Sequence, residues 1–464
     1  MSSYPNNIIT AISTAPGVGG IAVIRVSGEG SVSLVDQLFK SPSGKVLDEQ
    51  SANTVHFGSV FQDEQLVDDV LVSVFRAPHS FTGEDVVEIA CHGSLFIQQN
   101  ILQLLISKGA AMAKPGEFTQ RAFLNGKMDL SQAEAVADLI ASNSAAAHRM
   151  ALTQMRGGFS DELTKLRTHL LDFASLIELE LDFSEEDVEF ADRTQLKDLA
   201  NQVEDVIARL ARSFKLGNAL KNGIPVALVG ETNVGKSTLL NVLLNDDKAI
   251  VSDVHGTTRD VIEDSVIIDG IEFRFIDTAG IRNTTDTVEK LGIERTFKKI
   301  EQASIVLWLV DGTQATEHIE WLTEKITKLA AGKIILVFNK TDKISEEELG
   351  ILNQLFEQFD AERVYISAKK KHNIELLENA LLKAAQLPEI NQSDVIVSNI
   401  RHYEALERAL ASIRRVIDGL ESGLTNDLLA LDIRDCMSYL GEITGQISND
   451  EILGNIFGKF CIGK

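Results

Sequence analysis

The chain is poor in cysteine and short of positive charge. Its three cysteines, Cys91, Cys436 and Cys461, cannot form a disulfide framework, and their spacing fits no zinc site. Lysine and arginine number 44 against 68 acidic residues, which gives a net charge of −24. This charge excludes a broad basic surface that coats nucleic acid. An RNA partner would therefore be recognised by shape or shared with another protein.

Long apolar runs are also missing. No stretch approaches the length needed to cross a bilayer, and the first residues, MSSYPNNIIT, have no basic region followed by an apolar one. We therefore expect a cytoplasmic protein that does not enter a membrane. The 464 residues show no internal repeat and are too many for one hydrophobic core, so two to four domains are expected.

The hydrophobic pattern alternates between α/β and helical parts. Residues 1 to about 115 contain Val- and Ile-rich stretches such as IAVIRVSG (21–28) together with one helical pattern, which predicts a mixed α/β fold. From Pro115 to about Leu216 the pattern is helical, and it is helical again after Pro388.

Between these helical parts, strand and helix patterns alternate. The glycines and proline of KLGNALKNGIP (215–225) predict a linker, and the stretches after it predict a doubly wound parallel sheet. Since helical segments lie on both sides of this unit, we expect it to be inserted into one helical domain. The predicted fold is multidomain, α/β plus α.

A phosphate-binding loop opens the inserted unit. GETNVGKS (230–237) matches G-x-x-x-x-G-K-[ST] between an apolar strand and a helix, which is the context that this motif requires. Backbone N–H groups of such a loop converge on phosphate, and the helix N-terminus adds its dipole. Lys236 is expected to reach the β- and γ-phosphates, and Ser237 to bind Mg²⁺.

Two further stretches are expected beside the phosphates. DTAG (277–280) ends a hydrophobic strand, where Asp277 can hold the Mg²⁺ shell and the Gly280 N–H can meet the γ-phosphate. GTTRD (256–260) lies between the two motifs and offers Thr258 to the same metal.

A guanine-specific pocket is expected from two later stretches. In NKTD (339–342) the Asp342 carboxylate can accept from guanine N1–H and the 2-amino group, which adenine does not offer. SAK (367–369) completes the pocket. The five stretches occur in the order GETNVGKS, GTTRD, DTAG, NKTD and SAK, so the sequence predicts a Ras-like P-loop GTPase domain.

The predicted nucleotide site draws on every one of these motifs. Ser237 and Thr258 are the expected Mg²⁺ ligands. The residues expected to bind GTP are Asn233, Val234, Gly235, Lys236, Ser237, Thr238, Ser252, Asp253, Val254, His255, Gly256, Thr257, Thr258, Asp277, Thr278, Ala279, Gly280, Asn339, Lys340, Asp342, Ser367, Ala368 and Lys369.

One position departs from the Ras-like pattern. Many small GTPases follow the DxxG glycine with a glutamine that orients the attacking water, but this chain has Ile281 there. Another group or a partner must then position the water. Glu289 is an acidic candidate, with an ordinary surface helix position as the alternative.

Beyond the nucleotide motifs, the chain resembles the MnmE (TrmE) family of bacterial tRNA-modification GTPases. The resemblance rests on GETNVGKS, DVHGTTRD and DTAGIR, on SFTGEDVVE (80–88) and KPGEFTQRAFLNGKMDLSQAEAVADLI (114–140), and on the terminal CIGK. It implies a tetrahydrofolate-binding domain over 1–116, a helical domain in two segments, 117–220 and 387–464, and a G domain over 221–386.

The resemblance also implies particular ligands. A folate, 5-formyl- or 5,10-methylene-tetrahydrofolate, is expected to contact Arg25, Glu88, Lys127 and Lys464. A K⁺ ion is expected where the G domains of a homodimer meet, and its expected ligands are Asn233, Ser252, Val254 and Thr257. Glu289 aligns with the glutamate that orients the water in this family, so it becomes the expected catalytic residue.

The reaction and partners follow from the same resemblance. The homodimer is expected to join the FAD-dependent protein MnmG in a heterotetramer or larger complex. Together they would add an aminomethyl or carboxymethylaminomethyl group to C5 of the wobble uridine (position 34) of certain tRNAs, with the carbon from the folate. The alternatives are a regulatory GTPase of the ribosome-assembly type and a folate-dependent transferase that uses GTP only for assembly.

The ending FCIGK (460–464) has several interpretations on residues alone. It has the cysteine spacing of a prenylation signal, but Gly463 stands where an aliphatic residue belongs. A frayed terminus is the other simple reading. The family resemblance instead turns this end towards the folate. Cys461 is then either a structural residue or a thiolate that adds to uridine C6.

Overall fold

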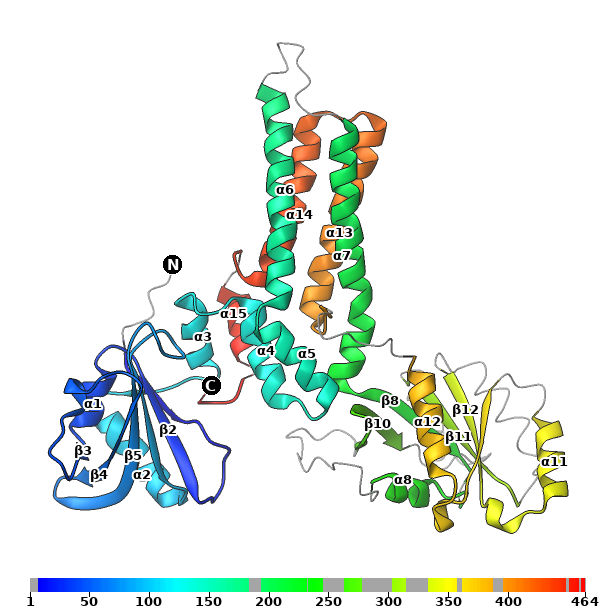
Figure 1. Cartoon of the computed structure of the whole chain (residues 1–464), viewed down its shortest axis with the longest axis horizontal. Helices are drawn as coiled ribbons and strands as arrows, with labels where there is room; N and C mark the ends of the chain where they lie inside the picture. Colours follow the sequence, from blue (N-terminus) through cyan, green and yellow to red (C-terminus); the bar gives the residue numbers. More distant parts are fainter. Residues whose placement is uncertain are drawn as a thin grey trace, which may run out of the picture. The chain divides into compact units, whose positions relative to one another are not determined.

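The structure is a computed structural model of the chain, drawn in Figure 1. It describes residues 7–182, 193–231, 233–244, 263–277, 303–313, 333–356, 361–386, 395–447, 450–458 and 460–463. The chain forms two compact units. The first comprises Met1–Ala137, Gln154–Val203 and Arg408–Lys464, and the second comprises Asp138–Thr153 and Glu204–Glu407.

A seven-stranded sheet lies in the first unit, with the strand order β3-β4-β5-β6-β2-β1-β7. Its neighbouring strands are antiparallel except for the parallel pair β1 and β7. The strands are β1 (Ile9–Ile12), β2 (Ile21–Ser27), β3 (Phe39–Lys40), β4 (Thr54–Gln62), β5 (Gln65–Phe75), β6 (Val86–His92) and β7 (Ala111–Met112).

The alternation of buried and exposed side chains along these strands shows which face of the sheet packs against the core. In β5 the side chains of Val70, Val72 and Val74 are buried, while those between them are exposed or half-buried. They pack with residues of α1 (Ser31–Asp36) and α2 (Leu95–Ser107) in one hydrophobic cluster. The helix α3 (Glu117–Leu124) packs on the opposite face of the sheet, where its Phe118 joins a smaller cluster with β1.

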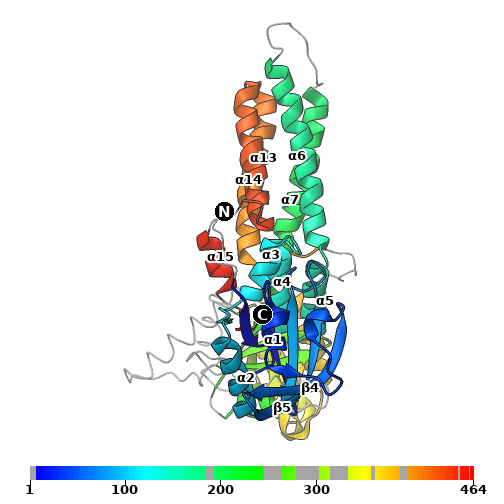
Figure 2. The same ribbon diagram turned by 90° about the vertical axis from the view of Figure 1, so that its left-hand side faces the viewer.

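Long helices complete the first unit. The helix α6 (Gly158–Asp182) packs along α14 (Asn426–Thr444), and the two run side by side in Figures 1 and 2. The last described helix of the chain is α15 (Asp450–Phe457). Four of the described helices begin in one unit and end in the other: α4 (Leu130–Ala141), α5 (Ala145–Met155), α7 (Arg193–Asn222) and α13 (Ile400–Ser422).

A six-stranded sheet forms the second unit, in the order β13-β12-β11-β8-β10-β9. All neighbours are parallel except β9, which pairs antiparallel with β10. The strands are β8 (Ile224–Gly230), β9 (Glu263–Ile268), β10 (Ile271–Asp277), β11 (Ile305–Asp311), β12 (Lys333–Asn339) and β13 (Glu362–Tyr365).

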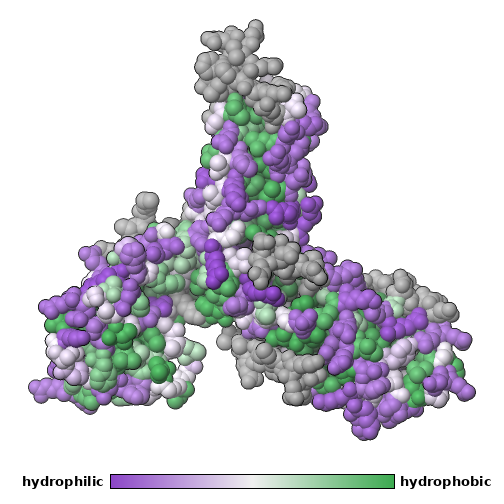
Figure 3. All heavy atoms as spheres, in the orientation of Figure 1, coloured by the Kyte–Doolittle hydropathy of each residue, from purple (hydrophilic) through white to green (hydrophobic). Residues whose placement is uncertain are grey.

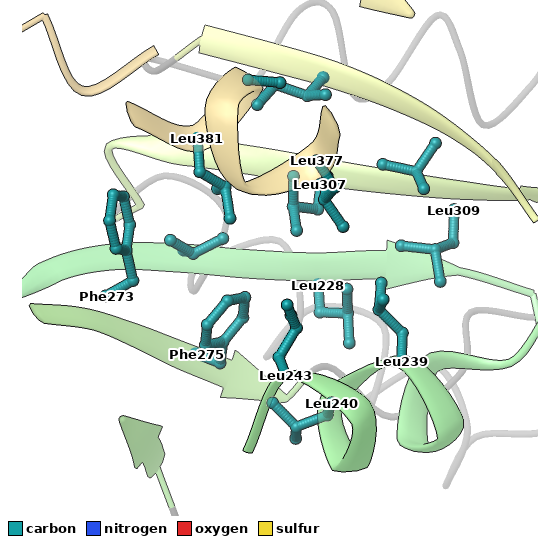
Figure 4. Packing of buried hydrophobic residues seen from close by; sticks show 14 of the residues in the cluster. Leu228, Leu239, Leu240, Leu243, Phe273, Phe275, Leu307, Leu309, Leu377 and Leu381 are labelled. Atoms are coloured by element: carbon teal, nitrogen blue, oxygen red, sulfur yellow. The ribbon is translucent and has the colours of Figure 1, made fainter. Parts of the chain in front are cut away.

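Both faces of this sheet are buried. Leu307 and Leu309 of β11 belong to a cluster with α8 (Lys236–Leu244) and α12 (Ile374–Ala385), shown in Figure 4. The alternate residue Trp308 belongs to a second cluster with α11 (Glu346–Leu355) and Phe356. Burial on both faces is typical of a doubly wound parallel sheet. The predicted fold class, α/β plus α with a P-loop domain, is confirmed.

The predicted linker at 215–225 is wrong. The helix α7 continues through Gly217 to Asn222, and β8 begins two residues later. Gly217 is needed for close packing, because a Cβ there would lie 2.1 Å from the carbonyl oxygen of Val397. Pro225 is the second residue of β8. Both residues therefore belong to regular elements.

The face shown in Figure 3 carries both hydrophilic and hydrophobic side chains among the described residues. On neighbouring strands of the first sheet, Val55, Phe57 and Leu71 are about half exposed, at 62%, 58% and 47%. Among the residues that the structure describes, no helix is long and apolar enough to cross a membrane.

Candidate functional site

The phosphate-binding loop connects β8 to α8 in the second unit. Lys236 is the first residue of α8, and its Nζ donates to the carbonyl oxygens of Gly230 and Glu231, each at 2.8 Å. Ser237 and Thr238 follow it and are exposed. The first turn of α8 thus presents two hydroxyls beside helix N–H groups, an arrangement suited to an anion and a hard cation.

Two positions give the loop its shape. Asn233 has a φ of 66° and Gly235 a φ of 102°, both in the region that favours glycine or asparagine. A Cβ on Gly235 would lie 2.4 Å from Nδ2 of Asn339, so only glycine fits. The glycine of the motif is therefore required by packing as well as by backbone conformation.

Asn339 ties the phosphate loop to the pocket for the base. It lies at the end of β12 and is 3% exposed. Its Nδ2 donates to the carbonyl oxygen of Val234 at 2.8 Å, and its Oδ1 accepts from the backbone N–H of Ala368 at 3.0 Å. One buried amide side chain thus links the phosphate loop, NKTD and SAK.

Asp342 is the residue predicted to recognise the guanine base. It lies in the 3-10 turn η2 (Thr341–Lys343) and is exposed, and its Oδ1 accepts from the Ser367 hydroxyl at 2.6 Å. That hydrogen bond holds the pKa of Asp342 below its ordinary value. The carboxylate is therefore ionised and oriented, and it can accept hydrogen bonds from a base.

Lys340 beside it has a partner that the sequence reasoning missed. Its Nζ lies 2.5 Å from Oδ2 of Asp311, the last residue of β11. Burial raises the pKa of Asp311, but hydrogen bonds from Lys340 and Thr313 outweigh burial, so the pKa is lowered. The sequence did offer a signal for Asp311. It begins the Asp-Gly pair that follows the apolar run SIVLWLV, and so it ends a strand as Asp277 does.

The structure brings together only part of the predicted nucleotide site. The phosphate loop, Asn339, Lys340, Asp342 and SAK gather at the carboxyl ends of β8 and β12, where ligands bind in open α/β sheets. Asp277 ends β10 opposite Leu228 of β8, and its backbone alone is described. The remaining residues predicted for this site, which lie outside the described residues, are Ser252, Asp253, Val254, His255, Gly256, Thr257, Thr258, Thr278, Ala279, Gly280 and Glu289. Lys464, predicted for the folate site, also lies outside them.

A second polar site lies on the sheet of the first unit. Arg25 of β2 and Glu88 of β6 are directly opposed, and Nε and Nη2 of Arg25 lie 2.9 and 2.8 Å from Oε1 of Glu88. The guanidinium carbon lies 5.3 Å from the ring centre of Phe81 and 5.6 Å from that of Phe118. The Arg25 guanidinium is thus paired with a carboxylate and lies near two aromatic rings.

Lys127 approaches the same region through the loop that carries Phe81. Its Nζ donates to the carbonyl oxygen of Pro78 at 3.0 Å. A Cβ on Gly83 would lie 3.3 Å from Cγ of Lys127. This loop is fixed at its far end, where Arg121 pairs with Glu84 at 3.1 Å. Three of the four residues expected to bind folate therefore contact one loop or each other.

Comparison with known proteins covers the whole chain. Residues 130–461 match the family model described as MnmE helical domain, and residues 8–127 match the one described as GTP-binding protein TrmE N-terminus. The tRNA modification GTPase MnmE of Bacteroides thetaiotaomicron is 59% identical over 461 residues, which cover 98% of this chain and 99% of that protein. The chain belongs to the MnmE family.

Other MnmE proteins are similar to the same extent. The protein of Flavobacterium johnsoniae is 55% identical over 460 residues, again covering 98% of this chain and 99% of the relative. Among solved structures, a crystal structure of Aquifex aeolicus Era, a variant bound to GDP.AlF4-, has 29% identity and a TM-score of 0.30, covering 40% of this chain and 66% of that one. The predicted family, MnmE (TrmE), is confirmed.

Proposed function

We propose that this protein hydrolyses GTP to drive modification at C5 of the wobble uridine of certain tRNAs. The supporting observation is that the family match runs end to end in a chain where Asn339 is hydrogen-bonded to both the phosphate loop and Ala368, and Asp342 to Ser367. In this proposal the protein acts in the cytoplasm and is an enzyme rather than a regulatory switch.

The hydrolytic chemistry is proposed for the loop between β8 and α8. Lys236 exchanges its two carbonyl acceptors for phosphate oxygens, while N–H groups of α8 meet the same phosphates. Ser237 and Thr258 hold Mg²⁺, which neutralises charge between the phosphates. The exposed Ser237 hydroxyl in the first turn of α8 fits that role. Glu289 orients the attacking water in place of a glutamine.

A potassium ion is proposed beside the same loop. Its ligands are Asn233, Ser252, Val254 and Thr257, all through oxygen, as a hard cation prefers. Asn233 is exposed in its left-handed conformation, which leaves its side-chain oxygen available. The ion supplies positive charge where other GTPases use an arginine finger, when two G domains of the homodimer meet.

The pair Arg25 and Glu88 is proposed to bind the folate. Glu88 accepts from the amino edge of the pterin, and Arg25 donates to a carbonyl or carboxylate. The rings of Phe81 and Phe118 restrict Arg25 in advance, which lowers the entropy lost on binding. Lys127 and Lys464 complete the set, and the bound folate supplies the one-carbon unit.

The proposed partners are a second copy of this chain, the protein MnmG and the tRNA. Two copies associate, and the half-exposed Val55, Phe57 and Leu71 offer an apolar surface for such a contact. The FAD-dependent protein MnmG joins the homodimer in a heterotetramer or larger complex. Because this chain carries a net charge of −24, binding of the tRNA phosphates is left largely to that partner.

Mass spectrometry of tRNA nucleosides tests this function. In cells that lack the protein, the C5 aminomethyl and carboxymethylaminomethyl groups of wobble uridine should be absent, and they should return when the gene is restored. An unaffected nucleoside profile would contradict the proposal and favour a GTPase switch without tRNA chemistry. Uridine modifications at other tRNA positions serve as the internal control.

Turnover of GTP should depend on the alkali cation. Because Ile281 cannot orient water and Asn233 is available as a ligand, we expect hydrolysis at least about 10-fold faster in K⁺ than in Na⁺ at equal ionic strength. The measurement is steady-state phosphate release in the two salts, with nucleotide affinity determined in both. Equal rates would remove the cation from the mechanism.

A further inference from the structure

The last residues of the chain are hydrogen-bonded to the beginning of the first sheet. The Ser13 hydroxyl donates to the carbonyl oxygen of Gly463 at 3.0 Å, across 450 positions of sequence. Nearby, the backbone N–H of Gly116 donates to the carbonyl oxygen of Cys461 at 3.4 Å. The end of the chain is thus held by one side chain and one backbone group.

Gly463 fits this place because it has no side chain. It is buried and has a φ of 99°. A Cβ there would lie 2.2 Å from the carbonyl oxygen of Ile12 and 3.1 Å from Cα of Ser13. Any other residue would be strained by its backbone and would also collide with β1.

The segment before it is anchored by packing. Phe457 and Phe460 are buried in a cluster with Leu130 and Ala133 of α4. A Cβ on Gly116 would lie 2.7 Å from the carbonyl oxygen of Phe457, so this contact also requires glycine. The Ser13 hydrogen bond is therefore made by the last described residue, shortly after this packed cluster.

The strand register places Ser13 beside the polar site. Ala11 of β1 pairs with Arg25, and the backbone N–H of Ser13 donates to the carbonyl oxygen of Val23 at 2.8 Å. Alternate residues of a strand share a face, so Ser13 and Ala11 lie on the Arg25 face of the sheet. Ser13 thus binds the tail on the face that carries Arg25 and Glu88.

We propose that Ser13 is a positioning residue that fixes the C-terminal tail against the Arg25 and Glu88 site, so that folate meets a preformed wall. We call the contact between Ser13 and Gly463 the tail latch. The positioning role rests on the proposed folate site, whereas the latch itself can be tested without folate. The hydroxyl acts only through the tail and does not contact the ligand.

Carboxypeptidase B tests the latch directly. This enzyme removes a C-terminal lysine, and the Ser13 hydroxyl donates to the carbonyl of the bond that it cleaves. Cleavage requires the tail to detach, so its rate follows the detached population. We expect loss of Lys464 from the full-length protein to be about fivefold faster in Ser13→Ala, since one hydrogen bond is lost. Gly463→Ala should be faster still.

Matched variants separate the latch from general damage. Ser13→Thr keeps the hydroxyl and should restore slow cleavage. Ser41→Ala removes a surface hydroxyl that bonds only to Ser43 among the contacts described, and it should match the wild type. For Gly463→Ala the control is Gly454→Ala, where a Cβ meets nothing within 4 Å. Equal cleavage of Ser13→Ala and wild type would overturn the latch.

Binding of 5-formyltetrahydrofolate, measured by calorimetry, tests the positioning role. We expect Ser13→Ala to bind it about fivefold more weakly and Ser13→Thr to bind as the wild type does. Faster cleavage with unchanged folate affinity would overturn the positioning role. If the wild type itself binds no folate, the folate part of the proposed function is wrong and the positioning role fails with it, while the cleavage rates still decide whether the latch exists.

Discussion

Replacement of Asp342 by Asn should lower the affinity for GTP by roughly 10⁴-fold and create a preference for xanthosine triphosphate. The Asp342 carboxylate is ionised and held by the Ser367 hydroxyl, so we expect it to accept two hydrogen bonds from the guanine edge. Asparagine keeps one acceptor for the N1–H but replaces the other with an NH2 donor, which clashes with the 2-amino group of guanine and matches the C2 carbonyl of xanthine. Fluorescent-nucleotide titration measures both affinities.

The control for this variant is Asp269→Asn. Asp269 lies in the turn between β9 and β10 with a φ of 49°, a conformation that asparagine tolerates. That variant should bind GTP as the wild type does. Retained GTP affinity in Asp342→Asn would contradict the assignment of the base pocket, whatever the effect on xanthosine triphosphate.

Gly235→Ala should weaken nucleotide binding by about 10²-fold or more. The substitution forces a φ of 102° on alanine and drives its Cβ to within 2.4 Å of Nδ2 of Asn339. The strain of order 1–3 kcal/mol adds to a similar cost for the buried amide that loses its partner, at about 1.4 kcal/mol per tenfold change. Calorimetric titration with GDP measures the loss.

Gly350→Ala provides the matched control. Gly350 lies in α11 of the same unit, where an added Cβ meets nothing within 4 Å. Alanine should leave nucleotide affinity unchanged there and stabilise the helix by about 0.5–1 kcal/mol. Tight GDP binding by a folded Gly235→Ala variant would show that Asn339 does not hold the loop as described.

The nucleotide pocket was predictable where chemistry and local sequence coincide. The phosphate loop, Asp342 and SAK follow strands and bind a ligand of fixed geometry, so residue order in the motifs gave their positions. The buried link through Asn339 was not predictable in detail. It joins residues 105 positions apart, and its contacts depend on the sheet order, which the motifs do not contain.

Other features of the fold were hidden for the same reason. Gly217 suggested a linker, yet it lies within α7 where the backbone of Val397 approaches, a long-range requirement with no local signal. Asp311 was visible as the end of a strand, but its ion pair with Lys340 follows from the parallel pairing of β11 and β12. The Ser13 contact with Gly463 spans almost the entire chain.

We propose that GTP hydrolysis, rather than GTP binding alone, drives tRNA modification. Glu289→Ala is the variant that separates the two, since it should bind GTP normally while single-turnover hydrolysis slows by about 10²-fold. An unchanged single-turnover rate would remove Glu289 from the mechanism. Glu346→Ala, which changes an exposed residue at the start of α11, is the control.

The decisive measurement is mass spectrometry of wobble-uridine nucleosides in cells whose only copy of the protein is Glu289→Ala. We expect the C5 modifications to stay absent or strongly reduced, while the Glu346→Ala protein restores them at equal abundance. Full restoration by a Glu289→Ala protein with slow hydrolysis confirmed in vitro would contradict the account, because modification would then need bound GTP but not its turnover.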